Sequence, residues 1–161
     1  MFLQIYAFQT PMLMKLTLLI VPLIFFSSCS LLWEFRDIEE VSDYKWMPDD
    51  VKTFDYTASE AQHLNVFILI RHVHGFPAAS FPVHLEIEGS EGSETNIVDI
   101  DVMNGAGNYV GEGSGDLWDI KHLAQTEKIF KPGEYQIRIG HAVDGKVVPL
   151  IMEVGIQLEK P

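Results

Sequence analysis

The chain has 161 residues, of which 23 are acidic and 11 are Lys or Arg, and its formal net charge is −12 at pH 7. Such an acidic balance argues against a nucleic-acid partner and against a surface that adheres to anionic lipid headgroups. The single cysteine, Cys29, excludes an intramolecular disulfide. Residues 29–161 suffice for one domain with a substantial core.

The N-terminal segment is uncharged and apolar over residues 16–26, LTLLIVPLIFF, behind the cation Lys15. A membrane-spanning helix needs about 20 apolar residues, whereas a shorter stretch followed by small residues is typical of a secretory signal peptide. Ser27 and Ser28 directly before Cys29 resemble the lipobox of bacterial lipoproteins, in which cleavage leaves the cysteine first and lipid-modified. We therefore predict a signal peptide over residues 1–28, with Met12 or Met14 as alternative starts, and lipid on Cys29. Lipidation would also consume an otherwise unpaired thiol.

Residues 29–46 have mixed charge and no sustained period, which predicts a lipidated tether. Its aromatic residues, Trp33, Phe35, Tyr44 and Trp46, are unusual for a solvated linker. We expect part of this tether to dock on the domain as a first strand or an irregular cover. The domain itself is predicted over residues 47–161.

Beyond Trp46 the pattern consists of short period-two segments separated by turns. This pattern favours an all-β fold, a single antiparallel β-sandwich of about eight strands, immunoglobulin-like or jelly-roll-like. Residues 64–73 are apolar on both faces and predict a central strand covered on each side. In the last strand, residues 151–158, Met152, Val154, Ile156 and Leu158 are expected on one face. The other predicted strands lie at 51–57, 83–88, 96–103 and 135–141, with turns at 89–92, 131–134 and 144–145.

One long interruption separates these strands at residues 104–123, NGAGNYVGEGSGDLWDIKHL. Loops of this length are usually irregular or functional. We expect a helical turn near residues 120–125, with Asp116 and Asp119 as caps and Trp118 driven into the core. Two interpretations stay open: a turn pinned by a buried tryptophan, or a recognition loop. The candidate interaction residues are Gly113, Gly115, Asp116, Trp118 and Asp119.

Three stretches, residues 113–119 (GSGDLWD), 130–135 (FKPGEY) and 149–160 (PLIMEVGIQLEK), resemble the gliding-motility lipoprotein family GldH of Bacteroidetes. That family has a signal peptide, a lipobox cysteine, one β-rich domain, a G-x-G-D-x-W-D stretch and a C-terminal I-M-D/E-V-G strand. Two departures stand out. Residues 71–76, RHVHGF, lack an asparagine of the family pattern, and residues 149–151 lack a glycine often found before the isoleucine.

The resemblance implies a cell-envelope lipoprotein associated with the gliding machinery and with the linked type IX secretion apparatus. Its role would be structural or concerned with assembly, since no catalytic role is established for the family. The expected partners are the membrane, through lipid on Cys29, and other envelope proteins. We expect the domain to lie in the periplasm.

Catalytic and metal sites find little support in the residues. His72 and His74 fall on one face of a strand, where a third ligand from His84 or His141 would complete a zinc site, but cysteine ligands and H-E-x-x-H spacing are missing. Asp116 and Asp119 with nearby glycine carbonyls leave a calcium site open, but no D-x-D-x-D-G loop supports one. Ser114 lies in G-S-G rather than G-x-S-x-G. We therefore predict no enzyme, no metal and no cofactor.

Two classes of function remain. In the first, the chain is an interaction lipoprotein whose sandwich edge or glycine-rich loop docks onto envelope proteins. In the second, it binds envelope or external carbohydrate, with Trp46, Tyr109 and Trp118 as stacking platforms. The exposure of these aromatic side chains discriminates the two classes, because a buried ring cannot stack on a sugar.

Overall fold

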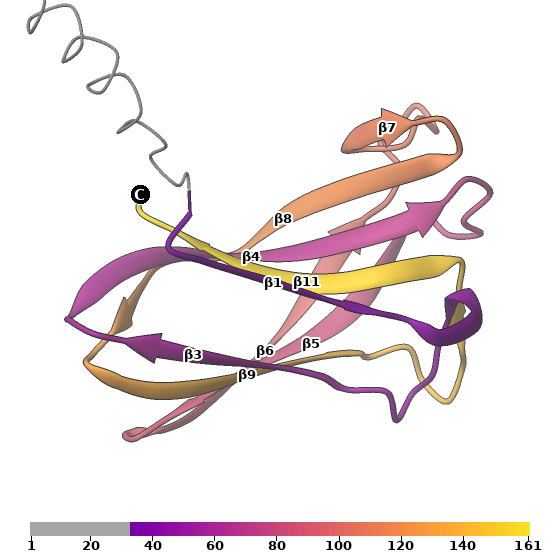
Figure 1. The fold of residues 1–161 in the computed structure, drawn as a ribbon. Coiled ribbons are helices and arrows are strands. Elements are labelled where there is room, and N and C mark those ends of the chain that lie inside the picture. The colour runs from indigo at the N-terminus through magenta and orange to yellow at the C-terminus, as the bar shows by residue number, and fades with distance from the viewer. Residues whose placement is uncertain (1–32) are drawn as a thin grey trace, which may run out of the picture. The chain divides into compact units, whose positions relative to one another are not determined.

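The computed structural model describes residues 33–161, so the predicted signal peptide and Cys29 lie outside the described residues. This part of the chain forms two antiparallel sheets that pack face to face, as Figure 1 shows. The all-β, sandwich prediction is therefore confirmed, with eleven strands in residues 33–161 rather than about eight. Within the same residues, no helix is long and apolar enough to cross a membrane.

The five-stranded sheet has the order β1-β11-β4-β8-β7, and the four-stranded sheet has the order β3-β9-β5-β6. The strands of the first are β1 (Phe35–Glu40), β11 (Ile151–Glu159), β4 (Gln62–Val73), β8 (Leu117–Phe130) and β7 (Glu112–Ser114). Those of the second are β3 (Lys52–Ala58), β9 (Gly133–His141), β5 (Ser80–Gly89) and β6 (Gly92–Asp101). The 3₁₀ helix η2 (Ser42–Tyr44) leads into β2 (Lys45–Trp46), which pairs with β10 (Val148–Pro149).

The core lies between the two sheets and follows the predicted alternation. Residues 64, 66, 68 and 70 of β4 and residues 81, 83, 85 and 87 of β5 are buried, as are Phe54 and Tyr56 of β3. Strand β9 adds Ile137 and Ile139. Because alternate side chains of a strand point to opposite faces, each strand gives one row of apolar side chains to the interior. Trp46, with no exposed surface, seals one end of this core.

Strand β8 corrects the prediction for residues 104–123. Leu117 to Phe130 form one long strand that pairs with β4 along its length, so residues 120–125 are extended and not helical. Ile120 is buried, while Lys121 and Leu123 are exposed, which is the period of a strand with one wet face. Backbone pairing with β4 satisfies the polar groups that a helical turn would have satisfied internally.

The central strand β4 and the last strand β11 each depart from the prediction. One face of β4 is buried, but the other face, with Phe67, Leu69 and Arg71, is only half-buried, because the outer side of the five-stranded sheet is open. In β11 the register shifts between Ile151 and Glu153, so Ile151 is fully buried and Met152 falls out of the inward row.

The distal part of the predicted tether belongs to the sheets. Residues 35–40 form β1, which pairs with β11 from Phe35↔Leu158 to Glu40↔Glu153, and residues 45–46 form β2. The expectation that part of this segment docks as a first strand is thus realised in β1. The segment between Cys29 and the first paired residue is consequently short.

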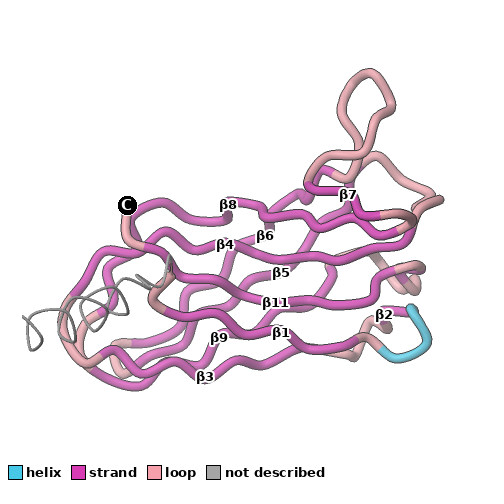
Figure 2. Tube along the Cα trace, turned by 45° about the horizontal axis from the view of Figure 1, so that its top comes forward, coloured by secondary structure: helices cyan, strands magenta, loops and turns pink. Residues whose placement is uncertain are grey.

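The strand directions gather the connections at two ends. The start of β1, the end of β11 and the turns at residues 59–61, 90–91 and 131–132 lie at one end, which we call the tether end. The turn between β7 and β8 and the connections at residues 41–51, 74–79, 102–111 and 142–150 lie at the other, the hairpin end. Figures 1 and 2 show the two ends at opposite sides of the sheets.

Candidate interaction surface

The predicted interaction residues form a β-hairpin at the hairpin end. Glu112, Gly113 and Ser114 of β7 pair with Asp119, Trp118 and Leu117 of β8. Gly115, with φ +62°, makes the turn together with Asp116. A positive φ favours glycine, which explains this residue at the turn. The correction to the prediction is that Asp116 and Asp119 cap no helix; they lie at the turn and on the strand.

Strand β7 is short because the chain leaves the sheet at Gly111. This glycine has φ +91°, and a Cβ added to it would lie 2.2 Å from the backbone oxygen of Asp119. Before Gly111, the amide of Val110 donates to the carbonyl of Val102, 2.9 Å away. Residues 102–111, which connect β6 to β7, thus form a loop between the end of β6 and the five-stranded sheet. This loop rises beyond the border of the sheet (Figure 2).

Trp118 pins the hairpin from its inner face. A Cβ on Gly113 would lie 3.0 Å from the Trp118 ring, so the indole occupies the space above this glycine. The indole also packs against Tyr109, whose ring centroid lies 5.1 Å away. Such cross-strand and aromatic contacts each contribute about 0.5–1 kcal/mol. Trp118 is partly buried rather than driven fully into the core.

Two hydrogen bonds tie this region to the end of β4. The amide of His74 donates to the carbonyl of Asp116 over 2.7 Å, and the amide of Gly75 donates to the Tyr109 hydroxyl over 2.7 Å. The hairpin and the loop before it are therefore held by backbone and aromatic contacts. The structure has features of both interpretations, the tryptophan-pinned turn and the recognition loop. Trp118 packs against the hairpin, and the turn itself, residues 114–116, is exposed.

The outer face of the hairpin carries an ion-pair network centred on Arg71 of β4. Its guanidinium donates to both carboxylate oxygens of Asp119, at 2.7 and 3.0 Å, and to Glu153 at 3.1 Å. Arg71 faces Asp119 on β8 and Glu153 on β11 in the strand registers. The hydrogen bonds with Asp119 are the main cause of a raised Arg71 pKa, so this arginine stays charged. Ion pairs this exposed contribute about 0–1 kcal/mol each to stability. Their main effect is therefore to position the Arg71, Asp119 and Glu153 side chains relative to one another.

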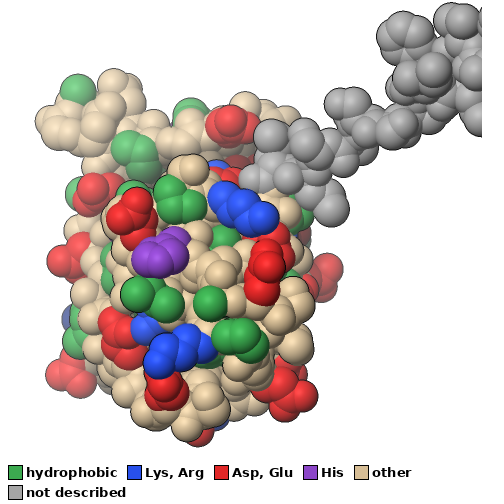
Figure 3. Space-filling view, turned by 90° about the vertical axis from the view of Figure 1, so that its left-hand side faces the viewer, with side chains coloured by type: hydrophobic (Ala, Val, Ile, Leu, Met, Phe, Trp, Pro, Cys, Tyr) green, Lys and Arg blue, Asp and Glu red, His purple; other side chains and the backbone are tan. Residues whose placement is uncertain are grey.

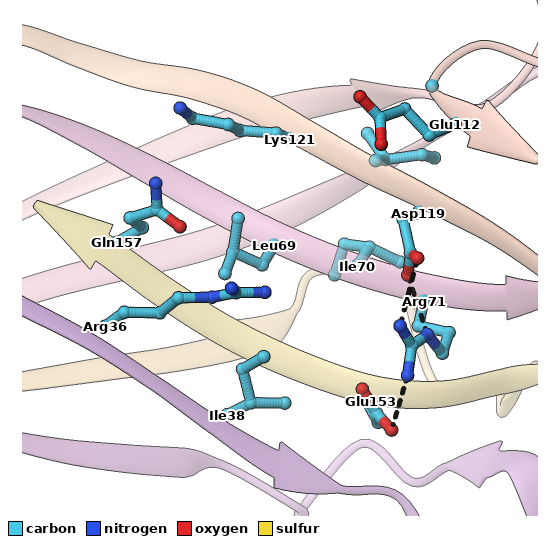
Figure 4. A pocket seen from close by; sticks show the side chains of 12 residues that line it. Arg36, Ile38, Leu69, Ile70, Arg71, Glu112, Asp119, Lys121, Glu153 and Gln157 are labelled. Carbon is cyan, nitrogen blue, oxygen red and sulfur yellow. Dashed lines mark hydrogen bonds and ion pairs between the residues drawn. The ribbon is translucent and has the colours of Figure 1, made fainter. Parts of the chain in front are cut away.

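Beside this network lies a shallow hollow of about 430 Å³ on the open face of the five-stranded sheet. Figure 4 shows Leu69 and Ile38 at its floor, with Arg36 reaching across it and Lys121 and Glu112 at the opposite side. A Cβ added to Gly155 would lie 2.6 Å from the Asp37 carbonyl and 2.8 Å from Ile38. Glycine at position 155 therefore allows β1 to approach β11 and brings Arg36 and Ile38 to the hollow.

Three stretches that are far apart in the sequence converge here: residues 71–75, residues 113–119 and the start of β11. Two of them carry the resemblance noted above. A model of the GldH lipoprotein family matches residues 34–158, from just before β1 to the penultimate residue of β11. The chain belongs to the GldH lipoprotein family. No curated protein matches the sequence.

In this GldH-family chain the third stretch of the resemblance, residues 130–135, lies at the tether end. The Tyr135 hydroxyl accepts a hydrogen bond from the Lys131 amide at 2.8 Å and donates one to the Lys131 carbonyl at 3.0 Å. The rings of Phe130 and Tyr135 meet edge to face, 4.9 Å between centroids. These contacts close the turn between β8 and β9, which makes this stretch a structural element of the fold.

The histidines considered for zinc do not converge. His72 is buried between Phe76 and Tyr109, and His74 is exposed. His84 lies on the four-stranded sheet, and His141 is buried against Trp46, 5.4 Å between ring centroids. Among residues 33–161, no group of three or more His, Cys, Asp or Glu side chains is placed to hold a metal ion.

The sequence did not indicate Arg71 as the centre of the surface. Asp119 was selected as a candidate, but its partner lies 48 residues earlier in the chain. The pairing depends on the register between β4 and β8, and that register includes two irregular steps near Val66. An arginine in an otherwise apolar predicted strand was the available signal, since a charged residue there requires a partner at the surface.

Proposed function

We propose that this GldH-family chain is a lipid-anchored component of the cell envelope that assists the assembly of the gliding machinery and the linked type IX secretion apparatus. It acts by binding other envelope proteins and not by catalysis. The family supports the lipoprotein and gliding part of this proposal. The hairpin at residues 112–119 supplies the binding surface, and lipid on Cys29 keeps the domain at the membrane.

The observation that carries the proposal is the exposed tip of the hairpin, which contacts on both flanking strands hold in place. Ser114, Gly115 and Asp116 are exposed, whereas the strands that hold them are fixed by Trp118 and by the Asp119–Arg71 ion pair. A surface that is ordered before binding loses less conformational entropy when a partner docks. This arrangement is typical of a recognition element and leaves the side chains of Ser114 and Asp116 exposed for a partner.

The carbohydrate alternative loses one of its three platforms. Trp46 has no exposed surface, and its indole N–H donates to the carbonyl of Asp50 at 2.7 Å. The rings of Tyr109 and Trp118 are half-buried and face each other. A sugar needs an open aromatic face, and these three residues form no such row.

The test is a charge reversal at the tip. A gliding bacterium whose own GldH-family gene is deleted would be complemented with the wild-type chain, with Asp116→Lys, or with Asp99→Lys as the matched control. Both aspartates are exposed, and neither side chain makes a hydrogen bond or ion pair within residues 33–161. We expect Asp116→Lys to reduce colony spreading, secretion of a type IX cargo protein and cross-linking to envelope proteins, while Asp99→Lys retains all three.

The variant Cys29→Ala separates the anchor from the surface. We expect it to leave the membrane fraction and to abolish spreading although the domain folds. If Asp116→Lys and Asp99→Lys both match the wild type in spreading, secretion and cross-linking, the hairpin is not the binding surface. If spreading and secretion survive complete deletion, the assembly role itself is wrong.

A further inference from the structure

The lipid anchor is close to one particular end of the domain. Six residue steps separate Cys29 from Phe35, the first residue of strand β1. At about 3.5 Å per residue, these two residues can lie at most about 21 Å apart. The predicted tether of residues 29–46 is therefore reduced to residues 29–34. A lipid on Cys29 keeps the start of β1 within that distance of the bilayer surface.

The hairpin lies at the other end of the same sheet. Gln62, at the tether end of β4, pairs with Phe130, and Val73, at the far end, pairs with Leu117 beside the hairpin turn. The eleven steps from Gln62 to Val73 span about 36 Å at the usual rise of a strand. This length exceeds the reach of the tether, so the domain cannot stand on its hairpin end with the tether end turned away from the membrane.

The charges of the connections differ between the two ends. At the tether end, residues 33–34, 59–61, 90–91, 131–132 and 160–161 contain three acids and two lysines. Two of these acids are paired: Glu91 with Lys131 at 2.6 Å and Glu34 with Lys160 at 3.8 Å. At the hairpin end, residues 41–51, 74–79, 102–116 and 142–150 contain six acids and two lysines, and one of these acids, Asp50, pairs with Lys52 of β3 at 2.9 Å. Anionic headgroups therefore repel the hairpin end more strongly than the tether end.

The tether end also exposes apolar surface. Ile129 of β8 is 54% exposed, and Pro132 beside it is exposed in the turn that follows. Figure 3 looks onto this end: apolar side chains lie in its middle, between two groups of Lys or Arg, and acidic side chains lie mostly around the rim. This distribution suits contact with the headgroup region, where apolar and cationic groups are tolerated together.

We propose that the tether end of the domain faces the lipid bilayer and that the hairpin end points away from it, toward the aqueous side. This orientation rests on the lipid anchor of the proposed function. It specifies which surface is closed to protein partners and which remains open. The contact is maintained by the anchor, because the acidic domain has little affinity of its own for anionic lipid.

The experiment uses the lipid-modified protein in vesicles of phosphatidylethanolamine and phosphatidylglycerol. Cys29 is the only native cysteine and carries the lipid, so one added cysteine can be labelled alone. Glu60→Cys places a fluorophore in the turn of the tether end, and Asp116→Cys places it at the hairpin tip. Asp144→Cys, on a separate loop of the hairpin end, is the matched control. All three positions are exposed. Quenching by lipids with nitroxide headgroups reports contact with the bilayer.

We expect strong quenching at residue 60 and little at residues 116 and 144, with a difference of at least severalfold because nitroxide quenching is short-ranged and about 36 Å of strand separates the ends. Equal quenching at the three positions, or stronger quenching at residue 116, would overturn the orientation. Co-sedimentation with vesicles distinguishes the two proposals. If the wild-type protein fails to sediment, the anchor and the proposed function fail together; if it sediments but quenching is uniform, only the orientation fails.

Discussion

Replacing Gly155 by alanine tests how β1 is held against the rest of the domain. The new Cβ would lie 2.6 Å from the Asp37 carbonyl oxygen and 2.8 Å from Cγ1 of Ile38. The first of these atoms belongs to the backbone of β1, so no side-chain rotation relieves the contact. Overpacking of this kind costs about 1–3 kcal/mol. The cost has an upper limit, because β1 can separate from β11 while β11 remains paired with β4.

The assay for Gly155→Ala combines two measurements. Urea unfolding followed by circular dichroism gives the loss of unfolding free energy, and hydrogen exchange gives the protection of the amides in residues 35–40. We expect a loss of about 1–3 kcal/mol, with the loss of protection concentrated in β1. Gly105→Ala is the matched control, since a Cβ at that glycine meets no atom within 4 Å and its φ is not positive.

The same substitution affects the hollow, because Arg36 and Ile38 reach it from β1. A variant with unchanged unfolding free energy and unchanged protection of β1 would refute the reasoning, since it would mean that the strand pair accommodates a methyl group without moving. A loss spread evenly over all strands would refute it too, because it would place the strain in the core and not at the edge.

Three further predictions concern stability. Trp46→Ala should cost about 3–5 kcal/mol in urea unfolding, because this ring is fully buried; a loss below 1 kcal/mol would contradict its role in the core. Tyr135→Phe should cost about 1 kcal/mol by removing the hydroxyl bonded to both backbone groups of Lys131, and no change would show that the turn closes without it. Burial lowers the pKa of His72 and of His141 below the usual 6.5, so the unfolded state binds more protons and stability should be constant above about pH 6.5 and fall below it. The double variant with leucine at both positions should flatten that fall between pH 6.5 and 5, and an identical pH profile would exclude these histidines as its cause.

The fold could be predicted from the sequence for strands that have one buried face and one face exposed to solvent, because their apolar and polar residues alternate. In β5 the alternation of Val83, Leu85 and Ile87 with polar residues is uninterrupted, and the structure has that face. Strand β8 was missed because Lys121, His122, Gln125 and Thr126 interrupt its apolar period. One face of this strand is exposed to solvent. Its edge opposite β4 pairs with β7 only at residues 117–119, and the rest of that edge pairs with no strand in residues 33–161. Its extended form depends on pairing with β4, which a local pattern does not contain.

The structure places the candidate residues in one hairpin, and their local geometry differs from the expected helical turn. Gly113 and Gly115 serve the hairpin in different ways: Gly115 adopts a positive φ at the turn, while Gly113 leaves space for the Trp118 ring. Asp119 was expected to cap a helix and instead pairs with Arg71. Long-range partners decide such roles, and a sequence of one chain does not reveal strand register.

The proposed orientation would change what a lipid on Cys29 implies for the partners of the hairpin. If Cys29 simply brought the whole domain to the membrane, the hairpin would meet partners embedded in the same bilayer surface. If the domain has the proposed orientation, with about 36 Å of strand between the ends, the hairpin tip stands away from that surface. Its partners then need a domain that projects an equal distance from a membrane, or that lies in the aqueous space of the envelope. Confinement to the membrane still raises the effective concentration of such partners, because the anchor restricts the search to one layer.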